Sequence, residues 1–210
     1  MKKIILVILT GIILSSCAQS NKTAADYGYQ HTIIIKSYDT VKNWELVPVS
    51  IQIKPALEAG DVLILKHREN EIAKVYIKGR LKIDRLRFRI RTLGTGSIVV
   101  FVHKPDGTQS VWSKNIVVNK YGKIPENNTQ KLAFKKRGGN GAVDIIINND
   151  SAKNGFVKKA TFSFPNGDAI ICGSQYLSPN PYMQVSPVNL VGKPKFKIEL
   201  AKNKHDKCDL

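Results

Sequence analysis

The stretch RLRFRIRT, residues 85–92, alternates arginine with large apolar side chains. Successive side chains of a β-strand point to opposite faces. One face of this segment would therefore be apolar and the other basic, with Leu86, Phe88 and Ile90 on the first and Arg85, Arg87, Arg89 and Arg91 on the second. Short apolar runs bounded by turn signals recur along the chain, without a long helical pattern. This combination predicts an all-β fold built from sandwiches.

The basic face of this strand has two interpretations. In the first, the arginines bind an anion, which makes Arg85, Arg87, Arg89 and Arg91 candidate anion-binding residues. In the second, the face is solvated, and the arginine stems cover neighbouring apolar surface. The second interpretation is the more common one for such a face, and the sequence leaves both open.

The expected strands fall into two series. The first series comprises residues 31–37, 47–53, 61–67, 72–79, 86–92, 97–104 and 111–119, and the second comprises residues 131–136, 142–149, 157–164, 168–174, 182–188 and 195–202. Two segments predict hairpin turns, KPDGT at 104–108 and FPNGD at 164–168. Asp-Gly and Asn-Gly supply the positive φ values that tight hairpin turns need.

A segment between the two series has no apolar periodicity. Residues 120–130 contain Gly, Pro and Asn, which is typical of a linker. We therefore expect two tandem domains, residues 31–119 and 131–210. Each is long enough for one small sandwich core.

The N-terminal segment has the features of an export signal. Lys2 and Lys3 precede an apolar run that is too short to span a bilayer, so residues 1–16 are predicted to be a signal peptide. The residues LSSC resemble the bacterial lipobox, in which the cysteine receives a lipid, and this predicts Cys17 as the lipidation site. An ordinary signal peptide with a chance cysteine is the alternative. Residues 17–30 are polar and small and are expected to form a flexible tether.

Export and charge together limit the partners. Two or more acyl chains give stable anchoring, so we expect a membrane-tethered protein that faces the periplasm. Ala18 follows the cysteine, with no Asp to suggest inner-membrane retention, so the outer membrane is favoured. The formal net charge is +17. For an exported protein this indicates lipid headgroups, lipopolysaccharide, an acidic partner or a small anion rather than nucleic acid.

The chain carries little that indicates catalysis. His31, His67, His103 and His205 are scattered without metal-site spacing, and acidic residues are few and dispersed. The glycine-rich segments at 94–97 and 138–141 lack the context of a phosphate-binding loop. We therefore expect no metal, no cofactor and no enzymatic activity, and instead a binding or carrier protein.

Two further cysteines remain, Cys172 and Cys208. In the strand AIICGS, alternation places Cys172 on the same face as Ile170 and opposite to Ile171. Cys172 is either a buried apolar thiol or bonded to Cys208, which would tie down the tail. A third alternative leaves Cys208 free and reactive on a mobile arm. The neighbouring lysines favour a thiolate and the neighbouring aspartates oppose it, so the local charges do not predict an activated thiol. Its accessible position is the only argument for a reactive Cys208.

Residues 155–185 resemble SoxZ, one half of the SoxYZ carrier of bacterial thiosulfate oxidation. The resemblance rests on a Phe-Val strand, an Asn-Gly turn and the segment Ser-Pro-Asn-Pro-Tyr, in which Asn180, Pro181 and Tyr182 correspond to a SoxZ motif. The His-Pro-Met-Glu segment of SoxZ is absent. More weakly, VPVSIQI at 47–53 and RFRIRTLGTGSIVVFVHKPDG at 87–107 are similar to strands of SoxY.

This resemblance implies two immunoglobulin-like β-sandwiches and a non-catalytic carrier or scaffold that presents a sulfur compound to sulfur-oxidation enzymes. SoxY carries sulfur on a cysteine in a Gly-rich arm, whereas this chain has Lys120-Tyr121-Gly122-Lys123 at that point. Cys208 is therefore the candidate carrier thiol, unless the covalent role has been lost. The competing hypothesis is a lipid-anchored envelope-binding or adhesion module that grips an anionic polymer through its basic surface.

Overall fold

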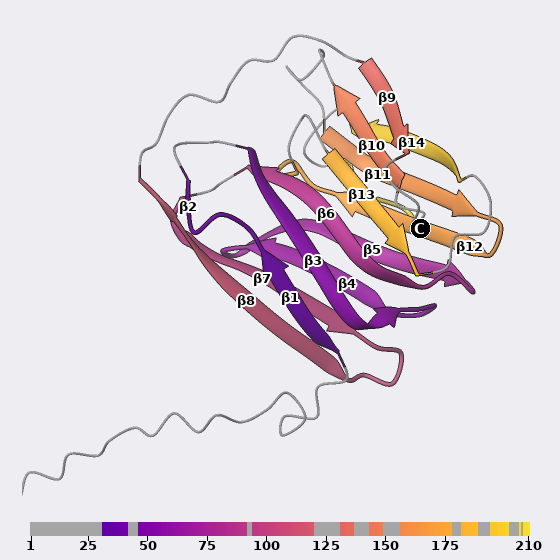
Figure 1. Ribbon diagram of the computed structural model, residues 1–210, viewed down its shortest axis with the longest axis horizontal. Coiled ribbons are helices and arrows are strands. Elements are labelled where there is room, and N and C mark those ends of the chain that lie inside the picture. The colour runs from indigo at the N-terminus through magenta and orange to yellow at the C-terminus, as the bar shows by residue number, and fades with distance from the viewer. Residues whose placement is uncertain are drawn as a thin grey trace, which may run out of the picture.

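The computed structural model describes residues 31–41, 46–91, 94–119, 131–136, 143–148, 156–177, 182–188, 194–201, 206 and 208–210. These residues form strands, turns and short connections (Figure 1). Within this part of the chain, no helix is long and apolar enough to cross a membrane. The predicted all-β class is confirmed for the described residues.

Each strand that the sequence predicts is present. The first series forms β1 Thr32–Lys36, β3 Leu46–Leu57, β4 Val62–His67, β5 Asn70–Gly79, β6 Ile83–Arg91, β7 Gly96–His103 and β8 Gln109–Val118. The second series forms β9 Lys131–Lys136, β10 Val143–Asn148, β11 Phe156–Phe164, β12 Gly167–Gly173, β13 Tyr182–Pro187 and β14 Lys195–Ala201. One additional strand, β2 Thr40–Val41, was not predicted. A segment of two residues is too short to show the alternation of apolar and polar side chains that identifies a strand.

The strands form two sheets. The six-stranded sheet has the order β1-β3-β6-β13-β10-β9, and the eight-stranded sheet has the order β14-β11-β12-β5-β4-β7-β8-β2. Almost all neighbouring strands are antiparallel, and β2 pairs with β8 in parallel. A layered pair of sheets with apolar inner faces is the sandwich that the alternation predicts.

Both sheets run from one predicted domain into the other. In the six-stranded sheet β6 pairs with β13, where Arg87 is opposite Gln184. In the eight-stranded sheet β5 pairs with β12, where Lys74 is opposite Cys172. The linker predicted at 120–130 lies outside the described residues, and the division into two tandem domains stays a prediction. The hydrogen-bonded sheets themselves are continuous across the two halves.

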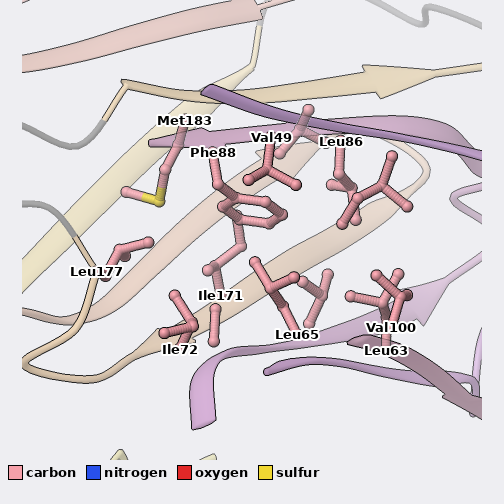
Figure 2. Packing of buried hydrophobic residues seen from close by; sticks show 14 of the residues in the cluster. Val49, Leu63, Leu65, Ile72, Leu86, Phe88, Val100, Ile171, Leu177 and Met183 are labelled. Atoms are coloured by element: carbon pink, nitrogen blue, oxygen red, sulfur yellow. The ribbon is translucent and has the colours of Figure 1, made fainter. Parts of the chain in front are cut away.

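The core lies between the two sheets and draws on both halves. Phe88 and Met183 from one sheet face Leu65 and Ile171 from the other (Figure 2), and each is at most 1 % exposed. The alternation in β6 is confirmed, because Leu86, Phe88 and Ile90 are buried while the intervening arginines are partly or largely exposed. Burial of these side chains supplies the main stabilisation, at roughly 25 cal/mol per Å² of apolar surface.

Both predicted hairpin turns form. In the first, the Lys104 N–H donates to the Thr108 carbonyl at 3.0 Å, and Gly107 has a φ of 85°. In the second, Gly167 has a φ of 147°, and a Cβ at this position would lie 2.0 Å from the Lys78 carbonyl oxygen. The second glycine is therefore required both for its backbone conformation and for the close approach of β5.

Candidate functional site

The candidate site is built on the outer face of the eight-stranded sheet, around Cys172 in β12. Cys172 pairs in register with Lys74 of β5 on one side and Lys159 of β11 on the other. Ile171 belongs to the core between the sheets, whereas Ile170 and Cys172 do not belong to that cluster. The predicted facing of this strand is thus confirmed.

Cys172 is only 8 % exposed although it faces outward. Its Sγ is bonded to Sγ of Cys208, and the two Cα atoms lie 5.6 Å apart. Of the three alternatives that the sequence left open, the structure contains the disulfide. Cys208 is therefore not a free thiol in this state.

Ionic contacts also hold the C-terminal residues against β11. The Lys158 ammonium lies 3.6 Å from a carboxylate oxygen of Asp209, and the Lys159 ammonium donates to the Asp209 main-chain oxygen. Both lysines face solvent in part, so these contacts contribute little by themselves. Together with the disulfide they place the end of the chain on this face of the sheet.

A pocket of about 480 Å³ lies beside the disulfide. Its walls include both cysteines, Lys74, Tyr76 and Tyr176, along with Glu71, Phe156, Gly173, Ser174, Gln175 and Asp206. Lys74 and Glu71 form an ion pair at 3.1 Å. The Ser174 hydroxyl donates to the Glu71 carbonyl oxygen at 2.6 Å, which fixes the loop that follows β12. A pocket of this size accepts a small ligand.

The pocket gives a small solute access to a disulfide sulfur. Disulfides exchange when a nucleophilic sulfur attacks one of the two sulfur atoms, and access decides which of them is attacked. Cys172 is buried, whereas Cys208 is partly exposed. The arrangement therefore favours attack on Cys208, with the buried Cys172 as the leaving thiolate.

The four predicted anion-binding arginines divide into two groups. Arg87 and Arg89 line a groove of about 410 Å³ with Lys36 and Tyr38 on the six-stranded sheet. Arg85 and Arg91 do not line that groove. Burial lowers the pKa of Arg91 from its usual value, and its backbone N–H donates to the Tyr176 carbonyl oxygen at 3.3 Å.

A buried polar cluster was not predicted from the sequence. His31 Nε2 lies 3.8 Å from Asp61 Oδ2, and both side chains are 1 % exposed. The Lys104 ammonium lies 3.7 Å from Asp61 Oδ1, and the Pro55 carbonyl oxygen lies 3.0 Å from His31 Nδ1. These residues are far apart in sequence, so no spacing could reveal the cluster. Within the described residues, no group of His, Cys, Asp and Glu is arranged to hold a metal.

Several predicted residues lie outside the described part of the chain. These are the signal peptide at 1–16, the lipidation site Cys17, the tether at 17–30, and Asn180 and Pro181. Tyr182 is described by its backbone, as the first residue of β13. The roles assigned to these residues stay predictions.

Comparisons with known proteins include a partial likeness to a solved structure. No protein-family model matches the chain, and no curated protein matches it. Among solved structures, the sulfur carrier protein SoxY from Chlorobium limicola f thiosulfatophilum is 22% identical, with a TM-score of 0.36. The match covers 42% of this chain and 79% of that chain. It concerns SoxY alone, and the resemblance of residues 155–185 to SoxZ stays a prediction.

Proposed function

We propose that this protein is a non-catalytic carrier, anchored at the cell envelope by a lipid on Cys17, that holds a sulfur-containing anion on Cys208. It would present that anion to partner enzymes of thiosulfate or sulfur oxidation on the periplasmic side, with the outer membrane favoured. The observation that supports the carrier role is the Cys172–Cys208 disulfide in the wall of a pocket. The fused SoxY-like and SoxZ-like arrangement is part of this proposal.

The proposed loading step is a thiol–disulfide type exchange. The outer sulfur of thiosulfate attacks Cys208 Sγ, and the bond between Cys208 and Cys172 breaks. Cys208 then carries the group –S–SO₃⁻, and Cys172 leaves as a thiolate that takes a proton from water. The disulfide itself is the electron acceptor, because Cys172 is reduced to the thiol. Sulfite reacts in the same way and leaves –SO₃⁻ on Cys208.

Position makes Cys208 the better carrier of the two cysteines. Cys172 sits in the middle of the sheet, between β5 and β11, and is 8 % exposed. Cys208 lies next to the C-terminal residues Asp209 and Leu210, and Leu210 is 60 % exposed. The contacts of Asp209 with Lys158 and Lys159 are weak surface contacts, so opening the disulfide should loosen this end of the chain. The loaded cysteine can then swing out toward a partner.

Lysines near the disulfide suit an anionic attacker. Lys74 lines the pocket, and Lys158 and Lys159 approach Asp209 beside it. Glu71 and Asp206 oppose them within the pocket wall. A nearby cation raises the local concentration of an anion and stabilises the departing thiolate.

Mass spectrometry of the oxidised full chain tests this function. The chain is incubated with sulfite or with thiosulfate, without reductant, and quenched with acid so that the Cys172 thiol cannot close the disulfide again. We expect an adduct on Cys208 and one free thiol at Cys172. An adduct on Cys172 alone, or no adduct at all, contradicts the proposal.

The variant Cys172→Ser provides the matched control. It leaves Cys208 as a free thiol without a disulfide to act as electron acceptor, so it should gain no adduct under the same conditions. A separate control addresses the anchor, since Cys17→Ser should move the protein from the membrane fraction to the soluble fraction. Retention of that variant in the membrane fraction contradicts the lipid anchor but not the carrier step.

A further inference from the structure

We propose that the six-stranded sheet carries a second, separate binding site, a groove that takes a sugar bearing a sulfate or phosphate ester. The groove is the hollow of about 410 Å³ lined by Lys36, Tyr38, Pro48, Ser50, Arg87 and Arg89. It lies on the other sheet from the Cys172–Cys208 disulfide, and its occupation does not depend on sulfur chemistry.

The groove exists because β1 leaves the sheet early. Lys36 is the last residue of β1 and pairs with Ser50 of β3. The chain then crosses through Ser37 and Tyr38 to β2, which belongs to the eight-stranded sheet. Where β3 continues past this point, its Pro48 pairs with Arg89 of β6. The space that β1 would have occupied is left open beside β3.

Three cationic side chains are among those that line this space. Lys36, Ser50 and Arg87 form one row across three strands, because Lys36 pairs with Ser50 and Ser50 pairs with Arg87. Arg89 follows two residues after Arg87 on the same strand and face, roughly 7 Å away. No acidic residue is among those that line the groove in the described part of the chain. Lys36 and Arg87 therefore complement an anion in the groove.

The chemistry of the cations suits an oxyanion such as a sulfate or phosphate ester. Guanidinium groups bind the oxygens of sulfate or phosphate with two parallel hydrogen bonds, whereas lysine contributes a point charge. Arginines on neighbouring rows present such donors side by side. A single oxyanion fills only a small part of the groove, so the remaining volume leaves room for a larger body attached to the anion.

Tyr38 and Pro48 provide the surface for that body. The Tyr38 side chain is 58 % exposed at the rim of the groove, where a ligand can reach its ring. An aromatic face packs well against the C–H face of a sugar ring, and its hydroxyl serves a sugar hydroxyl. Anionic ester and sugar ring together account for the cations, the aromatic rim and the volume.

Calorimetric titration of the full chain tests this site. The probes are a sulfated and a phosphorylated glucosamine disaccharide, the uncharged disaccharide, and inorganic sulfate and phosphate. We expect at least one of the charged disaccharides to bind about tenfold more tightly than the uncharged sugar and the free ions. Equal affinity for free ion and charged sugar overturns the proposal, as does the absence of binding.

Two arginines of the same strand give a matched pair of variants. Arg87→Gln removes one charge inside the groove, and we expect affinity to fall about tenfold or more, as for loss of a charged hydrogen bond. Arg85→Gln removes one charge from the same strand outside the groove. We expect it to change affinity less than threefold. Equal losses would show that diffuse charge binds the sugar, and that result overturns the site.

Variants at the end of β1 keep the test independent of sheet stability. Lys36→Gln and Tyr38→Leu alter exposed positions at the rim, so the fold should tolerate them. We expect each to weaken binding of the charged disaccharide several-fold. Affinity unchanged in both variants contradicts the groove as the site.

Discussion

Cys208 is bonded to Cys172 of β12 across a sequence separation of 36 residues. This bond fixes the C-terminus on the outer face of the eight-stranded sheet, beside a pocket. It closes a loop that contains β13 and β14. Variants that lack this bond test its effect on stability, whereas adduct formation tests its proposed chemistry.

Removal of the disulfide should destabilise the protein. Closing a loop of this length is worth about 3–4 kcal/mol in the chain-entropy account. We expect Cys208→Ser and Cys172→Ser each to lower the midpoint of thermal unfolding by roughly 5–15 °C. The double variant should lose little more than either single variant, because all three lack the same bond. Additive losses would indicate that packing of the individual cysteines, rather than the bond, supplies the stability.

The continuous sheets predict a single cooperative unfolding transition. Leu65 in the first half and Ile171 in the second are both fully buried in the shared core. We expect Leu65→Ala or Ile171→Ala to cost about 2–5 kcal/mol and to lower the same calorimetric transition. Ile34→Ala, at a position 45 % exposed, should change stability by less than about 0.5 kcal/mol.

Two separated transitions would contradict this prediction. If Leu65→Ala lowered one of them and Ile171→Ala the other, the two halves would unfold as the independent sandwiches that the sequence suggests. Agreement between calorimetric and van't Hoff enthalpies is the measurement that decides between the two outcomes.

His67 should make stability fall in mild acid. Its side chain is fully buried, both ring nitrogens are without a hydrogen-bond partner in the described part of the chain, and burial lowers its pKa from 6.5 to about 4. Between these two values the unfolded chain binds a proton and the folded chain does not. Stability should therefore decrease as pH falls from 6.5 toward 4, by up to about 3 kcal/mol from this residue.

Urea unfolding at pH values across this window measures the effect. His67→Leu should abolish this part of the pH dependence, whereas His103→Leu, at a partly exposed position of β7, should leave it in place. An NMR titration gives a direct check, because the His67 ring signals should titrate with a midpoint near pH 4. A midpoint near 6.5 for His67 in the folded protein would refute the assignment.

The two hairpin glycines should respond differently to alanine. Gly107 has positive φ but open space around a Cβ, so Gly107→Ala should cost only about 1 kcal/mol of backbone strain. At Gly167 a Cβ would also meet the Lys78 carbonyl oxygen. Gly167→Ala should therefore cost at least about 2 kcal/mol, as measured by thermal unfolding. Equal costs would show that β5 moves away without penalty.

Local patterns account for the parts of the structure that the sequence predicts well. Alternation in β6 and the facing of Cys172 follow from the two-residue period of a strand, which holds wherever one face is buried. The Asp-Gly and Asn-Gly turns follow from the backbone freedom of glycine. Neither feature depends on distant residues.

Features that depend on distant pairing could not be predicted. Pairing of β6 with β13 and of β5 with β12 merges the two series into common sheets, and no local signal specifies which edges meet. The same holds for the approach of His31 to Asp61, and for the groove beside Lys36, which arises because β1 ends there. Each joins residues whose separation in sequence carries no information about their distance in space.

The sequence alone determined the strands, their buried faces, the turns and the candidate cysteine and arginine residues, because these follow from short-range stereochemistry and the hydrophobic effect. The tertiary structure decided that Cys172 and Cys208 meet, that Arg87 and Arg89 line the groove beside Lys36, and that the halves share their sheets. The physical reason is that strand pairing and side-chain contact are set by the packing of the whole chain.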